Sequence, residues 1–131
     1  MMIGDFLARS ARERGLRAEG AAAAWLEGQG YVVLARNHAT RRGEVDLVCR
    51  DGGTICFVEV RSRSRLDFGS PAATVDPAKA RRVVAAAQDW AMRNGGLEQA
   101  MRFDVVAIDL SAGAPRFDLI RNAFDAEGHP M

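Results

Sequence analysis

The stretch GEVDLVCRDGGTICFVEVR, residues 43–61, decides the fold of this chain. Its two halves, GEVDLVCR at 43–50 and TICFVEVR at 54–61, are rich in β-branched and apolar residues, which favours strands. The turn sequence DGG at 51–53 separates them, so we expect an antiparallel hairpin. Both halves are apolar on both faces apart from a few acids, as is typical of strands covered on both sides.

Alternation along the strands predicts which side chains share a face. In the first strand it groups Glu44, Asp46 and Val48 on one face and Val45, Leu47 and Cys49 on the other. Glu59 is the acid of the second strand. Tracing the hairpin back from its turn puts Asp46 and Glu59 at the far end, on neighbouring strands, and we expect them to meet there.

Acidic residues in such strands cost free energy unless they are paired or bind a cation. Converging carboxylates are hard oxygen ligands, suited to Mg²⁺ or Mn²⁺ rather than zinc. Such an ion can polarise a phosphodiester and activate a water for hydrolysis. The alternative is a solvated strand end for Glu44 and Asp46, with Glu59 paired to Arg61 or Arg63.

The rest of the chain adds helices and strands around this hairpin. Apolar spacing predicts a helix over 16–29, with Leu16, Ala22, Trp25 and Leu26 sharing a face. We expect residues 1–14 to form an N-terminal arm or short helix and residues 31–37 to form a strand. Asp76-Pro77 begins a second helix that reaches about Asn94. Strands follow over 102–110 and, at an edge, 116–124, and residues 125–131 are a tail.

The order α-β-β-β-α-β, with one further strand, predicts an α/β fold in which helices pack on the faces of a mixed sheet. No internal repeat or linker interrupts the 131 residues, so we expect a single domain over 1–131. The 48% hydrophobic share is enough for a core.

Composition excludes several classes of protein. Two cysteines are too few for a disulfide scaffold, and a net charge of +1 excludes a histone-like nucleic-acid binder. No apolar run is long enough to span a membrane, and no signal peptide is recognisable. We therefore expect a cytoplasmic protein with Cys49 and Cys56 as free thiols.

The same string continues to RSRS at 61–64, with FG at 68–69, Lys79 and RFDVVAI at 102–108. Together these motifs resemble the YraN-like family of uncharacterised bacterial proteins, over about residues 15–124. That family is similar to the PD-(D/E)xK nucleases and close to the Holliday-junction resolvases. The resemblance implies a restriction-endonuclease-like fold, whose α-β-β-β-α-β core has the order predicted above.

The resemblance also implies roles for four acids. Asp46 falls on the acid of the PD motif and Glu59 on the acid of (D/E)xK. Glu19, in the first helix, falls on an additional acid that resolvase-like members use near the metal. Glu44 belongs to the GE-x-D signature and would support the other acids. The implied metal set for Mg²⁺ or Mn²⁺ is therefore Asp46, Glu59, Glu19 and Glu44.

The chain departs from the nuclease pattern at Arg61, which stands where the motif has its catalytic lysine, two residues after Glu59. Arginine keeps the positive charge and can brace a phosphate, but its very high pKa makes it a poor proton acceptor. Lys79 is the only lysine among 18 basic residues. It either reaches back to the site as a substitute lysine or phosphate contact, or is a solvated residue of the second helix.

Four arginines flank the acidic strands. They either contact phosphates on both sides of the metal site or belong to solvated basic loops. They are Arg41, Arg42, Arg63 and Arg65. Over residues 1–65, 11 arginines oppose 8 acidic residues, so a metal held by acids would leave a basic field. For Asp104 we expect a structural role.

The sequence thus predicts a metal-dependent endonuclease that hydrolyses DNA phosphodiesters, with branched or single-stranded DNA as substrate. Asp46, Glu59, Arg61 and Glu19 are the catalytic candidates. One alternative keeps the fold as a catalytically weak or inactive nucleic-acid-binding module, and another is a protein-interaction domain. A homodimer is expected by analogy with the resolvases.

Overall fold

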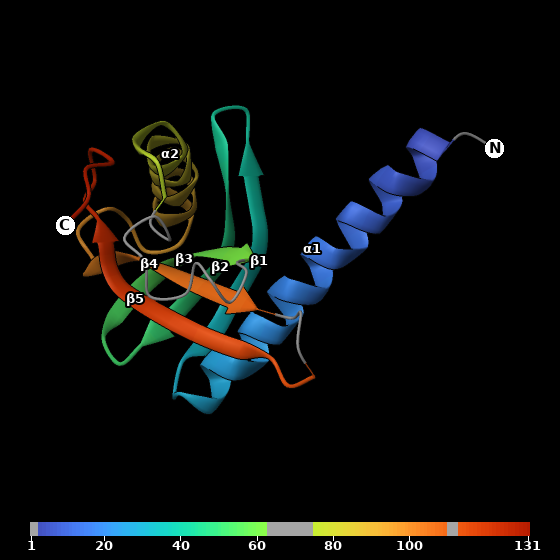
Figure 1. Cartoon of the computed structure of the whole chain (residues 1–131). Helices are drawn as coiled ribbons and strands as arrows, with labels where there is room; N and C mark the ends of the chain where they lie inside the picture. Colours follow the sequence, from blue (N-terminus) through green and yellow to red (C-terminus); the bar gives the residue numbers. More distant parts are fainter. Residues whose placement is uncertain (1–2, 63–74, 110–112) are drawn as a thin grey trace.

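The computed structural model describes residues 3–62, 75–109 and 113–131, with backbone only for 3–12 and 14. Arg63 and Arg65 lie outside the described residues. The elements are α1 (Ile3–Gly28), β1 (Val32–Thr40), β2 (Gly43–Asp51), β3 (Thr54–Ser62), α2 (Pro77–Arg93), β4 (Met101–Asp109) and β5 (Arg116–Phe124). This order confirms the predicted α-β-β-β-α-β arrangement with one further strand (Figure 1).

The five strands form one mixed sheet in the order β1-β2-β3-β4-β5. Neighbouring strands are antiparallel except β3 and β4, which are parallel. A parallel pair needs a long crossover, and α2 lies within that connection. The mixed sheet and its helices are consistent with the α/β restriction-endonuclease-like fold that the sequence predicts, and β5 is an edge strand as expected.

Two apolar clusters cover the two faces of the sheet. On the α2 face, Phe57 packs with Val83, Ala87 and Trp90. On the α1 face lie Ala22, Ala23 and Leu26 of α1, Tyr31 after it, and Leu47, Cys49, Cys56, Val58 and Val106 of the strands. Both cysteines are buried free thiols. The central strands are therefore covered twice, which explains why they are apolar on both faces.

Helix α1 is longer than predicted. Residues 3–14 belong to the same continuous helix, whose N-terminal half stands away from the sheet (Figure 1). Leu16, expected on the core face, is 50% exposed because α1 contacts the sheet only farther along its length. Within the described part of the chain, no helix combines the length and apolarity needed to cross a membrane.

Strand β2 departs from strict alternation at Asp46. Leu47 packs on the α1 face and Val48 on the α2 face, as predicted. Val45, expected beside Leu47, packs instead in the α2-side cluster. The register places Asn37 opposite Asp46, and Asn37 has a left-handed φ of 53°. A backbone irregularity at this point reorients the residues before Asp46.

The tip of the β1–β2 hairpin stands beside α2 (Figure 1). Gly43 lies so close to α2 that a Cβ at this position would overlap the backbone carbonyl of Arg82. His38, one residue past the predicted strand end at 37, lies in β1, and its Nε2 is 2.8 Å from Oδ2 of Asp89. The hairpin is thus held against α2 by a backbone contact and a polar side-chain pair.

Candidate functional site

An open cavity lies between α2 and the ends of β2 and β3 that are far from their turn. The residues that line it are Glu44, Asp46, Glu59, Asp76, Ala78, Lys79, Arg82 and Val83. Four of the eight are acidic and two are cationic. The cavity therefore gathers charged groups that are well separated in the sequence.

Asp46 reaches this cavity because the backbone pairing of β2 with β3, followed away from their turn, ends at Leu47 and Val58. Asp46 is the next residue of β2 in that direction. Beyond that pair, the Asp46 side chain takes the place of the backbone hydrogen bonds between the two strands. Its Oδ2 accepts a hydrogen bond from the backbone N–H of Val60, at 2.9 Å. The carboxylate is thereby fixed between the two strands, beside Glu59. The two acids lie together, where the course of the hairpin predicts them.

Glu59 is buried, with only 3% of the residue exposed. The pKa of its carboxyl group is raised to about 7, chiefly by burial and next by the charge of the neighbouring Asp46, against the opposing effect of Lys79. The Nζ of Lys79 lies 2.8 Å from Oε1 of Glu59. The only lysine of the chain therefore contacts the motif acid directly.

Glu19 of α1 approaches the same acids from the other side. Burial raises the pKa of Glu19, as does the charge of Asp46, while a hydrogen bond with Asn37 lowers it. Its Oε2 is buried and has no hydrogen-bond partner among the described residues. Glu44 is exposed and lines both the main cavity and a smaller one that includes Glu19.

The chemistry of these donors fits a hard divalent cation. The charge of Asp46 raises the pKa of both Glu59 and Glu19, and a cation between these like charges would relieve that repulsion. The unpartnered oxygen of Glu19 is a further donor. Nevertheless, the side chains as placed form no group of three or more His, Cys, Asp or Glu arranged around a metal position, within the residues described.

Among the described residues, the other candidates lie apart from this cavity. Arg61 is half-buried on β3 and does not line the cavity, whereas Lys79 does. Arg41 and Arg42 are exposed at the hairpin tip, where they line a separate hollow beside α2. Of the cations considered from the sequence, the described structure places Lys79 among the acids.

Three residues of the site have roles that the sequence analysis did not identify. Arg82 follows Lys79 by three positions, and this helical spacing was a usable signal. Asp76, predicted only as an N-cap, does accept from the backbone N–H of Lys79, at 3.0 Å, and also lines the cavity. Asn37, whose backbone is left-handed, forms a hydrogen bond with Glu19, and no sequence pattern indicated either feature.

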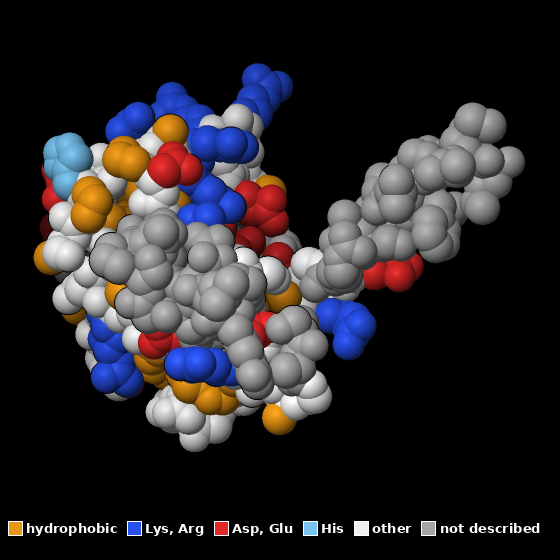
Figure 2. All heavy atoms as spheres, in the orientation of Figure 1, with side chains coloured by type: hydrophobic (Ala, Val, Ile, Leu, Met, Phe, Trp, Pro, Cys, Tyr) orange, Lys and Arg blue, Asp and Glu red, His pale blue; other side chains and the backbone are white. Residues whose placement is uncertain are grey.

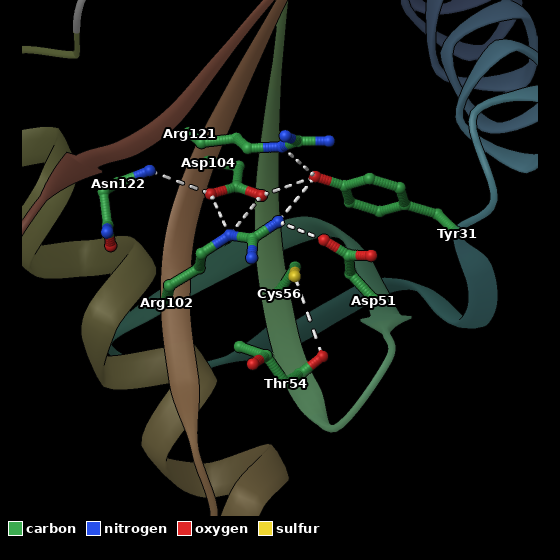
Figure 3. Close-up of polar contacts among 8 residues, drawn as sticks. All are labelled: Tyr31, Asp51, Thr54, Cys56, Arg102, Asp104, Arg121 and Asn122. Carbon is green, nitrogen blue, oxygen red and sulfur yellow. Dashed lines mark hydrogen bonds and ion pairs between the residues drawn. The ribbon is translucent and has the colours of Figure 1, made fainter.

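Asp104 belongs to a different polar cluster, on the α1 face of the sheet (Figure 3). It is fully buried and accepts hydrogen bonds from Tyr31 Oη at 3.1 Å, Arg102 Nε at 3.0 Å and the backbone N–H of Asn122 at 3.0 Å. Arg102 also contacts Asp51, at 2.9 Å. The cluster joins β4 to its neighbours and gives Asp104 the structural role expected of it.

Comparison with known proteins places the chain among close relatives. The family model described as "Uncharacterised protein family UPF0102" matches residues 18–108, a stretch that contains all the acids discussed above and includes Lys79 and Arg82. A UPF0102 protein of Anaeromyxobacter sp. (strain Fw109-5) is 59% identical over 130 residues, which cover 99% of this chain and 98% of the relative. A UPF0102 protein of Geobacter sulfurreducens is 47% identical over 112 residues, or 85% and 88% of the two chains.

Proposed function

The chain belongs to the UPF0102 family, and we propose that it is a metal-dependent endonuclease that hydrolyses DNA phosphodiesters, with branched or single-stranded DNA as substrate. One observation carries this proposal: Asp46, Glu59 and Lys79, from three different elements, line a single cavity. Two acids and a lysine are the groups that the PD-(D/E)xK motif requires. Here they come together although the motif position itself holds arginine.

Asp46 and Glu59 are the residues that would hold Mg²⁺ or Mn²⁺, with Glu19 assisting from α1 and Glu44 at the margin. When bound, such an ion supplies Lewis-acid polarisation of the phosphate and activation of a water. The protein's part is to fix these acids. The hydrogen bond from Val60 to Asp46 and the burial of Glu59 keep both carboxylates in place.

Lys79 takes the role that the motif gives to the lysine after the second acid. Its ammonium is held by Glu59, and its side chain is 49% exposed, so it can face a bound phosphate while remaining anchored. A positive charge fixed at this point stabilises negative charge that develops on the phosphate during hydrolysis. Arg61, on the same strand as Glu59, would add to the positive field without transferring a proton.

The second candidate function is a catalytically weak or inactive DNA-binding module or accessory protein with the same fold. Two observations favour it: the arginine at position 61, and acids that are not arranged around a metal position within the described residues. Under either function DNA is the proposed partner and the cytoplasm the proposed location. We also propose a homodimer, by analogy with the resolvases.

Cleavage of end-labelled four-way junction, single-stranded and duplex DNA in Mn²⁺ tests the proposal. The intact protein should cut, and Asp46→Asn should not, although asparagine can still accept the hydrogen bond from Val60. Glu98→Gln, an exposed acid away from the cavity, is the matched control and should cut normally. No cleavage by intact protein, or equal cleavage by Asp46→Asn, would contradict the nuclease function. Binding without cleavage would favour the second candidate.

A further inference from the structure

We propose that Arg82 is a phosphate-binding residue of this site, and that the bound DNA strand runs from the acidic cavity past Arg82 to Arg41 and Arg42 at the hairpin tip. This inference rests on the proposed function. It adds a residue that neither the motif nor the metal scheme includes, and it names the side of the cavity along which the strand lies.

The position of Arg82 relative to the acids is set by the backbone. Its carbonyl lies against Gly43, with no room for a Cβ between them. Gly43 begins β2, the strand that carries Glu44 and Asp46. The helix turn that bears Arg82 is therefore fixed directly beside the acidic strand, and interiors packed this closely do not shift easily.

The side chain of Arg82 is available to a ligand. Lys79 and Arg82 are three residues apart on α2 and so lie on the same helix face. Lys79 is paired with Glu59, whereas no hydrogen bond or ion pair joins the exposed Arg82 side chain to any other described residue. A free guanidinium at the rim of the cavity presents a planar fork of donors that matches two phosphate oxygens.

The charges around the cavity determine where an anion can approach. Its lining holds four carboxylates, one lysine and one arginine, which amounts to −2 when all are ionised. A divalent cation would bring this total to zero, but the strand beyond the scissile phosphate still needs positive charge. Of the two cationic residues that line the cavity, Lys79 is paired with a carboxylate and Arg82, among the described residues, is not.

Two further arginines lie beyond Arg82, at the hairpin tip. Farther along α2, Ala85, Gln88 and Asp89 line the adjoining hollow together with Arg41 and Arg42. In Figure 2, Lys and Arg side chains gather over α2 and the hairpin tip, next to a group of acidic side chains. A polyanion extending out of the cavity in this direction meets positive charge, as phosphate-backbone recognition requires.

The test measures DNA binding in EDTA, so that it does not depend on cleavage. Fluorescently labelled single-stranded DNA is titrated with intact protein, Arg82→Ala and Arg81→Ala over a series of salt concentrations. Arg81 is the matched control: it precedes Arg82 on α2, is also exposed, lies against Gly128 of the tail and does not line the cavity. We expect Arg82→Ala to weaken binding roughly tenfold and to reduce the slope of log K against log salt by about one.

Arg81→Ala should change affinity less than about twofold. If intact protein binds but Arg82→Ala has the same affinity and salt slope, the role of Arg82 is wrong while the proposed function stands. Equal losses in the two variants would also overturn it, because they would indicate net charge rather than a placed contact. If intact protein binds no DNA in EDTA even at low salt, this inference is wrong, while cleavage in Mn²⁺ still decides the proposed function.

Discussion

The Lys79 ammonium lies 2.8 Å from Oε1 of Glu59, and this contact joins α2 to the middle strand of the sheet. The two residues are unequal partners, since the Glu59 side chain is 4% exposed and that of Lys79 is 49% exposed. Even with this partner, the pKa of Glu59 is raised to about 7, chiefly by burial. The pair therefore combines a buried acid that ionises near neutrality with a cation that solvent and substrate can reach.

Removing this lysine should reduce catalysis much more than it reduces folding. We expect Lys79→Ala to lower kcat for DNA cleavage roughly 10²- to 10³-fold, because a charge aimed at the phosphate is lost. Lys79→Arg, which keeps the charge, should retain more activity than Lys79→Ala. Single-turnover cleavage in Mn²⁺ measures both variants, and thermal unfolding verifies their folding. A rate for Lys79→Ala equal to that of intact protein would eliminate Lys79 as the substitute lysine.

Glu59 should make the metal-free protein less stable as pH rises. Its pKa is about 7 in the folded protein against an ordinary 4.5, so the folded state holds the proton more tightly than the unfolded state. Its contribution to the free energy of unfolding is complete below pH 4.5 and is lost as pH rises through 7. Glu59→Gln cannot ionise, so it should gain stability relative to intact protein between pH 5 and pH 8.

Thermal unfolding in EDTA at several pH values measures this difference, with Glu98→Gln as the exposed control. A Tm difference between intact protein and Glu59→Gln that does not change with pH would contradict the raised pKa of Glu59.

Mn²⁺ should stabilise the folded protein through the acids of the cavity. A ligand that binds only the folded state raises its stability by about 2.7 kcal/mol at a hundred times its Kd. We therefore expect Tm to increase with Mn²⁺ concentration for intact protein and for Glu98→Gln. Asp46→Asn should respond little, since it loses one of the two principal ligands. An equal Mn²⁺ response in Asp46→Asn would mean that the ion binds elsewhere.

Gly43 should be intolerant of even the smallest side chain. A Cβ at position 43 would overlap the backbone carbonyl of Arg82, which cannot move without displacing α2. We expect Gly43→Ala to cost about 1–3 kcal/mol or more of unfolding free energy, as is typical of overpacking. Gly53, in the turn between β2 and β3, has open space and a backbone conformation without positive φ. Chemical denaturation of Gly43→Ala and Gly53→Ala should therefore give clearly different losses; equal small losses would contradict the close contact.

Asp104 should matter for stability and not for chemistry. It is fully buried and accepts from Arg102, Tyr31 and the backbone of Asn122 (Figure 3). Asp104→Ala leaves Arg102 and the other donors without this partner, so we expect a loss of about 3–5 kcal/mol. Denaturant unfolding measures it. Tyr31→Phe, which removes one hydroxyl, should cost less, and a near-zero effect of Asp104→Ala would contradict the structural role.

The sequence was sufficient for the order of elements and for the meeting of Asp46 with Glu59. Both follow from local patterns: apolar runs, a DGG turn, and the geometry of a hairpin. It was insufficient for Val45, because strict alternation does not anticipate the irregularity opposite Asp46, where Asn37 has a positive φ. Leu16 had the spacing of a core residue but lies where α1 has left the sheet.

The cations of the site were harder to predict than its acids. The motif directed attention to Arg61, two residues from Glu59 along the same strand. The structure places in the cavity Lys79, which the sequence offered as a substitute lysine, and Arg82, which it did not, because α2 begins over the strand ends. That proximity is tertiary, and no local pattern reports it. The three-residue spacing of Lys79 and Arg82 indicated only that the two side chains share one face of α2.

Asp46 and Glu59 are proposed to form a divalent-metal site. The most direct measurement is the anomalous scattering of a crystal grown with Mn²⁺. We predict a manganese peak in contact with carboxylate oxygens of both Asp46 and Glu59, with Glu19 turned toward it. A crystal at saturating Mn²⁺ with no peak there would contradict a metal site formed by these two acids.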